Sequence, residues 1–91
     1  MFPLFPLGQI VATPGALAAL ERAQPPPTCF LARHVSGDWG ELEPTDVAEN
    51  QYGIAHGFRF LSSFHTKAGE KPWIITEADR SATTLLLPEE Y

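Results

Sequence analysis

The chain has 91 residues, 44% of them hydrophobic, with eleven acidic and six basic side chains and a formal net charge of −5. This length accommodates one hydrophobic core, so the sequence predicts a single domain over residues 1–91, with residues 1–8 as a flexible or extended arm. An acidic chain whose few basic residues are scattered is poorly suited to following phosphates, which argues against nucleic acid as the main ligand.

The cysteine content and the apolar start indicate the compartment. Cys29 is the only cysteine, so the chain cannot form an intramolecular disulfide, and a reducing cytoplasm fits this usage. The first residues are apolar, but they lack a basic region and are interrupted by Pro3 and Pro6. We therefore expect neither a signal peptide nor a membrane span. Because one cysteine and three dispersed histidines lack metal-ligand spacing, and no cofactor motif is present, we expect no metal and no cofactor.

Residues 9–21 predict a short strand or extended segment followed by a helix. Thr13 is a suitable N-cap and Pro14 fits the first helical position. Leu17 and Leu20 would share one face of this helix. The prolines at 25–27 then force an extended link.

Residues 28–36 favour a second helix, although partial alternation also permits a strand. Thr28 would cap this helix and Gly37 would end it. Its apolar face would consist of Phe30, Leu31, His34 and Val35. Trp39 lies in the following loop, where a tryptophan either fills the core or faces a partner.

Residues 44–56 form the clearest helical pattern. Glu43 serves as the cap, Pro44 takes the first position, and Gly57 is the expected C-terminal glycine. Leu42 and Val47 occupy the two positions of a hydrophobic staple, and the apolar period runs through Val47, Gln51, Ile54 and Ala55. A glycine inside a helix costs about 1 kcal/mol relative to alanine, so Gly53 indicates that another segment approaches closely there.

After residue 57 the period changes from 3.6 to 2, which predicts strands. One face would carry Phe58, Phe60, Ser62 and Phe64, and the other Arg59, Leu61, Ser63 and His65. A loop at 67–71 and a tight turn at Asp79–Arg80 separate two further strands, at 72–78 and 81–88. The predicted class is α+β, with two to three N-terminal helices packed on a C-terminal three-stranded antiparallel meander. Residues 9–12 would be a fourth strand if they join its edge.

The polar face of this meander and its corner are the predicted binding surface. Arg59, Ser63 and His65 share one strand face, and Glu77, Asp79 and Arg80 lie at the corner between the last two strands. We place Trp39 near them by hypothesis. Exposed aromatic and charged residues of this kind recur in protein interfaces.

The alternative function is a metal-independent ribonuclease toxin of the barnase, EndoU and RelE type. Such cleavage needs a base for the 2′-hydroxyl, an acid for the leaving oxygen and a cation for the phosphate. His65 with Arg59 or Arg80 would supply these groups. Toxins of this type are commonly basic, whereas this chain is acidic, and polar residues on a solvent-facing strand side are expected in any case.

Four stretches, GQIVATPGAL, FLARHVSGDWGEL, HGFRFLSSFHT and WIITEADRSATTLLLPEEY, resemble a family of small proteins encoded on bacterial plasmids and other mobile elements. The similarity runs from Gly8 to the last residue, and the final stretch is its most specific part. This family has no established activity and supplies no catalytic residues. The resemblance implies a non-enzymatic accessory protein that binds a protein partner, for example a component of the host-defence machinery. The unpaired edge of so small a sheet also makes a homodimer an expectation.

Overall fold

A computed structural model of the chain describes residues 4–21 and 26–91. Within these residues the elements are, in order, β1 (Gln9–Ala12), α1 (Pro14–Glu21), α2 (Pro27–Val35), α3 (Pro44–His56), β2 (Phe60–Ser63), β3 (Trp73–Thr76), β4 (Ala82–Leu86) and the 3₁₀ helix η1 (Pro88–Glu90). The α+β class is confirmed. Because η1 follows the last strand, the helical segments are not all N-terminal.

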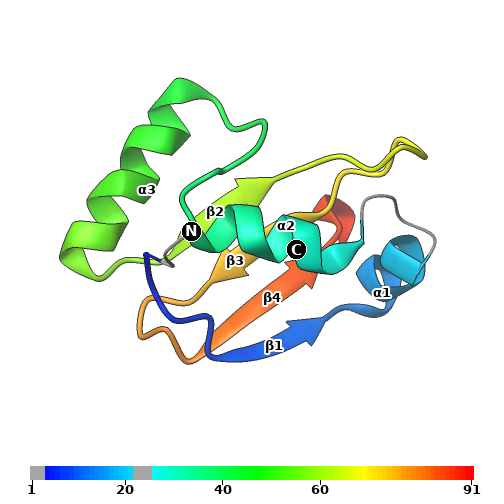
Figure 1. The fold of residues 1–91 in the computed structure, drawn as a ribbon, viewed down its shortest axis with the longest axis horizontal. Helices are drawn as coiled ribbons and strands as arrows, with labels where there is room; N and C mark the ends of the chain where they lie inside the picture. Colours follow the sequence, from blue (N-terminus) through cyan, green and yellow to red (C-terminus); the bar gives the residue numbers. More distant parts are fainter. Residues whose placement is uncertain (1–3, 22–25) are drawn as a thin grey trace.

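The sheet has the strand order β1-β4-β3-β2 (Figure 1). Strands β2, β3 and β4 form the predicted antiparallel meander. Strand β1 pairs with β4 in parallel, with Ile10 opposite Thr83. The fourth edge strand considered for residues 9–12 is therefore confirmed, whereas the prediction of a purely antiparallel three-stranded sheet is wrong, because the sheet is mixed. Two parallel strands need a long connection, and the chain between β1 and β4 supplies it.

Helices α1 and α2 cover one face of the sheet, where α2 crosses the strands (Figure 1). The buried cluster beneath them consists of Ala16, Leu20, Phe30, Phe64, Ile74 and Leu85. The alanines at positions 16 and 19 are buried in α1, whereas Leu17 is 54% exposed. The expectation that Leu17 shares the buried face with Leu20 is therefore wrong, because the small side chains are the ones that face the sheet.

A second buried cluster joins α3 to the sheet. Its centre is formed by Phe5, Trp39 and Phe60, with Leu42, Val47 and Ile54 packed around it. Phe5 belongs to the segment expected as an arm, and its ring lies 4.3 Å from that of Phe60. Trp39 is only 5% exposed, so it fills the core and is excluded from the exposed binding surface predicted for it.

The helix ends follow the sequence signals with one exception. The Oγ1 atom of Thr13 accepts a hydrogen bond from the Ala16 backbone N–H at 3.3 Å, and Gly57 ends α3 with a φ of 77°. Helix α2, however, begins at Pro27 after an extended Pro26, so the predicted cap at Thr28 is wrong. Proline presets φ for the first helical position, which places the start of α2 one residue earlier.

The inner side of α3 differs from the apolar period. Its buried residues are Asn50 and Gly53, whereas Gln51 and Ala55 are exposed. A Cβ atom on Gly53 would lie 3.3 Å from the carbonyl oxygen of Phe58, so the close approach expected at this glycine is confirmed.

In the described residues no helix has the length and apolar character needed to cross a membrane.

Candidate functional site

The sheet face opposite α1 and α2, called the open face below, is the candidate site. Successive side chains of a strand point to opposite faces, and Leu61 stands opposite Ile75, which stands opposite Thr84. The residues of the three antiparallel strands that share this face are Leu61, Ser63, Trp73, Ile75, Ala82, Thr84 and Leu86. The centre of the open face is therefore aliphatic and aromatic, unlike the polar face that the alternation suggested.

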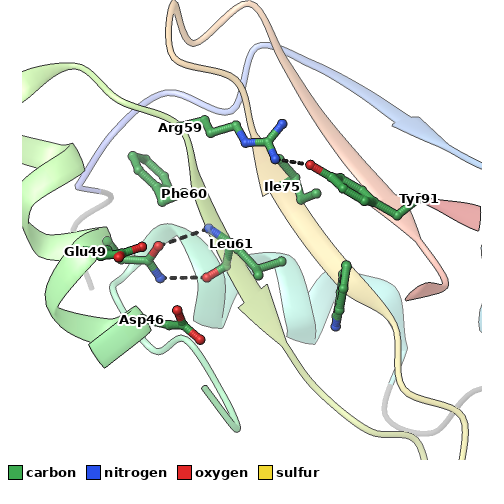
Figure 2. A pocket seen from close by; sticks show the side chains of 9 residues that line it. Asp46, Glu49, Arg59, Phe60, Leu61, Ile75 and Tyr91 are labelled. Atoms are coloured by element: carbon green, nitrogen blue, oxygen red, sulfur yellow. Dashed lines mark hydrogen bonds between the residues drawn. The ribbon is translucent and has the colours of Figure 1, made fainter. Parts of the chain in front are cut away.

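A hollow of about 300 Å³ lies where α3 meets the open face. Figure 2 shows Asp46 and Glu49 on the α3 side, Arg59 and Tyr91 on the other side, and Leu61 and Ile75 between them. Trp73 completes the lining from β3. The hollow thus combines an apolar floor with carboxylates along one wall and a guanidinium on the other.

Tyr91 follows η1 and folds back over the open face. Its ring lies 5.8 Å from that of Trp73 at an interplanar angle of 68°, which is an edge-to-face contact. Arg59 donates a hydrogen bond to the Tyr91 hydroxyl (Figure 2), and its guanidinium carbon lies 5.5 Å from the centre of the ring. This hydrogen bond raises the pKa of Arg59, which keeps the cation charged. Tyr91 is nevertheless 68% exposed, so most of its surface can contact a partner.

Asn50 fixes α3 against the edge of β2. Its side-chain amide donates to the Leu61 carbonyl at 2.6 Å and accepts from the Leu61 backbone N–H at 3.1 Å (Figure 2). A side chain that both donates and accepts in this way replaces a neighbouring strand. The wall of the hollow that carries Asp46 and Glu49 is thereby held at a set position relative to its floor.

A second depression, of about 440 Å³, adjoins the hollow. It is lined by Ala48, Glu49, Tyr52, Phe58 and Arg59, so the two concavities share Glu49 and Arg59. Tyr52 and Phe58 stack at 5.7 Å, and both rings are more than half exposed. Phe58 was expected on the buried strand face, but it precedes β2 and packs against α3 instead.

Three of the predicted binding residues lie on the same side of the extended segment that contains β2. Arg59, Ser63 and His65 alternate with the buried residues Phe60, Ser62 and Phe64, so the sidedness predicted for this strand agrees with the structure. The Nδ1 atom of His65 lies 2.5 Å from a carboxylate oxygen of Glu41. Both side chains are exposed.

The predicted corner residues divide between two sides. Glu77 directly follows β3, and its charge acts on Arg59, so these two belong together. Asp79 is exposed in the turn, where it accepts a hydrogen bond from the Ser81 backbone N–H at 2.9 Å. Hydrogen bonding to Ser81 lowers the pKa of Asp79, which keeps this carboxylate ionised.

Arg80 has a structural position that the sequence did not indicate. Its guanidinium lies over the ring of Phe60, on the buried side of the sheet. It donates hydrogen bonds to the backbone carbonyls of Gly53, Phe58, Glu77 and Ala78. Arg80 therefore joins the end of α3 to the β3–β4 turn and does not belong to the open face.

The three residues named for a ribonuclease are not brought together. Arg80 is bound to backbone carbonyls on the buried side. Arg59 and His65 are six residues apart along an extended segment, which separates their Cα atoms by about 20 Å at 3.3 Å per residue. A single phosphodiester cannot contact both.

Sequence reasoning missed most of the residues that line the two concavities. Trp73 was not among the predicted site residues, and it is half-buried on the open face. Asp46, Glu49 and Tyr52 follow a helical spacing of three residues along α3, which was the available signal for one shared wall. Tyr91 was not among the predicted site residues either, and it packs on Trp73.

In residues 4–21 and 26–91, no group of three or more His, Cys, Asp or Glu side chains is placed to hold a metal ion. Comparison of the chain with protein-family models, curated proteins and solved structures finds no match.

Proposed function

We propose that this chain is a small non-enzymatic accessory protein of a mobile genetic element, and that it binds a protein partner through the open face. The observation that carries the proposal is the hollow in which Arg59, Trp73 and Tyr91 meet. Arginine, tryptophan and tyrosine are the residue types most enriched where binding energy concentrates in protein interfaces. The mobile-element setting and the cytoplasmic location come from the sequence alone.

The rings at this site support an apolar contact of substantial size. Tyr91 lines the first concavity and Tyr52 the second, and Arg59 lines both. Aromatic side chains offer a large contact area with few rotatable bonds, so they lose little entropy on binding. A partner segment that spans both concavities would cover the four rings of Tyr52, Phe58, Trp73 and Tyr91.

The charges at this site favour a partner segment with a basic side chain among apolar ones. Asp46 and Glu49 give the hollow two carboxylates against the single guanidinium of Arg59, and the whole chain carries a net charge of −5. A lysine or arginine of the partner would lie between these carboxylates and the rings, where cation–π attraction adds to the charge attraction.

The geometry favours binding over RNA cleavage. A general base and a phosphate-binding cation must reach the same phosphodiester, and the separation between Arg59 and His65 prevents this. The involvement of Arg80 with backbone carbonyls removes the second candidate cation.

The test is affinity capture from host lysate with four baits: wild type, Tyr91→Ala, Tyr52→Ala and Lys67→Ala. Lys67 is exposed in the β2–β3 loop, away from both concavities, so Lys67→Ala is the matched control. We expect a host protein that wild type and Lys67→Ala retain, that Tyr91→Ala loses, and that Tyr52→Ala weakens if the segment spans both concavities. Equal retention by all four baits would overturn the assignment to the open face.

Cleavage is measured separately. Wild type and His65→Ala are incubated with RNA in EDTA, and both are expected to leave the RNA intact. Cleavage by wild type that disappears in His65→Ala would establish the enzyme instead.

A further inference from the structure

The outer edge of β1 is unpaired within the described chain. The Gln9 N–H donates to the Ser81 carbonyl and the Thr13 N–H to the Leu85 carbonyl, both at 2.9 Å. In a parallel pair, alternate residues turn their backbone groups toward the neighbouring strand. Val11 therefore also faces β4, while the N–H and C=O groups of Ile10 and Ala12 point outward. In Figure 1, β1 forms the border of the sheet, and no described element lies beyond it.

The opposite edge of the sheet, on β2, is closed. Asn50 satisfies both backbone groups of Leu61. The Ser63 N–H donates to the Trp39 carbonyl at 3.0 Å, and the Ser63 carbonyl accepts from the Glu41 N–H at 2.7 Å. Within the described residues, the β2 edge is thus covered, whereas the β1 edge has no partner strand.

The free edge also lacks the charged and proline side chains that often prevent pairing. Proteins protect edge strands with lysine, proline, bulges or inward-pointing charges, but β1 reads Gln-Ile-Val-Ala and no charged residue occurs in the first twenty positions. Ile10 is 50% exposed and Val11 is 39% exposed. Because Ile10 stands opposite Thr83 and Val11 opposite Thr84, these two apolar side chains extend both faces of the sheet.

We propose that β1 pairs antiparallel with β1 of a second copy of this chain, around a two-fold axis at Val11. Ile10 then stands opposite Ala12 of the second copy, and Ala12 opposite its Ile10. Each of these two pairs exchanges both backbone hydrogen bonds, so the outward groups of Ile10 and Ala12 are all satisfied. Val11 faces Val11 of the second copy as a non-hydrogen-bonded pair, in which side chains lie closest.

A second copy fits this edge better than a different strand for two reasons. The segment is self-complementary about Val11, as a two-fold interface requires. It is also uncharged in a chain of net charge −5, so two copies can approach here without placing like charges opposite one another. The pairing does not depend on the proposed function, because it involves neither concavity.

The first experiment measures mass by light scattering and sedimentation over a range of concentrations. We expect wild type to reach twice the monomer mass of 10.0 kDa. Val11→Lys would place two lysines face to face on the axis and is expected to remain monomeric. Leu17→Lys makes the same change in charge at another exposed apolar residue, on α1, and is expected to remain dimeric. A wild type that stays monomeric up to its solubility limit would overturn the proposal. This outcome includes the case in which the edge pairs with a different protein and not with a second copy.

The second experiment tests the register in a Cys29→Ser background. Val11→Cys is expected to form a disulfide-linked dimer on mild oxidation, because residues paired on the axis have Cα atoms within disulfide range. Ile10→Cys is expected not to cross-link, since each Ile10 is offset by two residues from its counterpart. In hydrogen exchange, the amides of Ile10 and Ala12 should gain protection as concentration rises, while Val11 is protected throughout by β4. A dimer that cross-links equally through both cysteines, or that leaves Ile10 and Ala12 unprotected, would assign the interface elsewhere.

Discussion

The Nε2 atom of His34 lies 2.9 Å from the Oγ1 atom of Thr76, inside the helix-covered face of the sheet. The contact continues to Thr83, whose Oγ1 atom lies 2.8 Å from that of Thr76 and donates to the Leu7 carbonyl at 2.7 Å. Because the Leu7 carbonyl only accepts, the Thr83 hydroxyl donates to it and accepts from the Thr76 hydroxyl. The Thr76 hydroxyl therefore accepts from Nε2, which is the protonated nitrogen of His34. Nδ1 then accepts from the hydroxyl of Ser62. A neutral imidazole therefore satisfies every hydrogen bond in this series.

Stability is expected to depend on pH through His34. Burial lowers the pKa of His34 to about 4 from 6.5, so the unfolded state takes up the proton first as the pH falls. The neutral ring contributes to the free energy of unfolding, fully above pH 6.5, and this contribution is lost between pH 6.5 and about 4. The total loss is about 3 kcal/mol. The free energy of unfolding by urea, measured between pH 5 and 7 to keep most carboxylates ionised, should rise with pH in wild type. His34→Gln should lack most of this slope, and equal slopes would contradict the assignment.

Asn50→Leu is expected to destabilise the domain by about 1–3 kcal/mol, the usual cost of unsatisfied polar groups. The substitution keeps the approximate volume but leaves the Leu61 N–H and carbonyl without their partner. Gln51→Leu, at the next and exposed position of α3, is the matched control and should change stability little. Urea unfolding of both variants is the measurement. A loss no larger than that of the control would show that water replaces the amide at no cost.

Arg80→Lys is expected to lower stability by about 1–3 kcal/mol although the charge is retained. A planar guanidinium can donate several hydrogen bonds at fixed angles, whereas an ammonium cannot reach the same set of carbonyls. Arg59→Lys, with its exposed side chain, is the control and should have a small effect on stability. Thermal unfolding of the two variants separates the roles: equal melting temperatures would mean that the carbonyl contacts of Arg80 contribute nothing.

Glu90→Gln is expected to loosen the contact between Tyr91 and Trp73. The Glu90 carboxylate accepts from Thr13, from the Gly15 N–H at 2.8 Å and from the Leu87 N–H at 3.0 Å. The hydrogen bond from Thr13 is the main cause that lowers the pKa of Glu90 from 4.5. The anchor is therefore present above pH 4.5 and is lost as the pH falls through the lowered value.

The measurement for this anchor is the NMR signal of the Trp73 indole. In wild type it should shift as acid releases η1, and in Glu90→Gln it should already be shifted at neutral pH. Glu89→Gln, at the neighbouring exposed position, should behave as wild type. A Trp73 signal that is unchanged in Glu90→Gln would show that Tyr91 is positioned without this carboxylate.

Much of the fold is predictable because its signals are local. The cap at Thr13, the prolines that start helices, the glycine at 57 and the two-residue period after it all act within a few residues of their own position. The long-range contacts that hold the elements around the site together are different in kind. Arg80 binds Gly53 and Phe58, and Glu90 binds Thr13. Charged residues at a turn or at the end of a chain look the same in sequence whether they bind distant groups or water, so only the folded arrangement assigns their partners.

The same distinction explains the errors at Trp39 and Leu17. Trp39 has glycine nearby and an acidic neighbour, which is typical of an exposed loop, yet its ring lies 5.5 Å from that of Phe60. Leu17 satisfies the helical period, but α1 approaches the sheet through Ala16 and Ala19. In both cases a distant surface decides burial, and periodicity carries no information about how closely that surface approaches.

The parallel pairing of β1 with β4 has a consequence for synthesis. Residues 9–12 leave the ribosome well before their partners at 82–85. Thr83, which completes the hydrogen-bonded chain through His34, arrives equally late. Such distant pairings form slowly, because a long loop must close before its contacts stabilise it. The sheet therefore cannot be completed until residues 82–85 have been synthesised, and the apolar strand β1 stays without this partner until then.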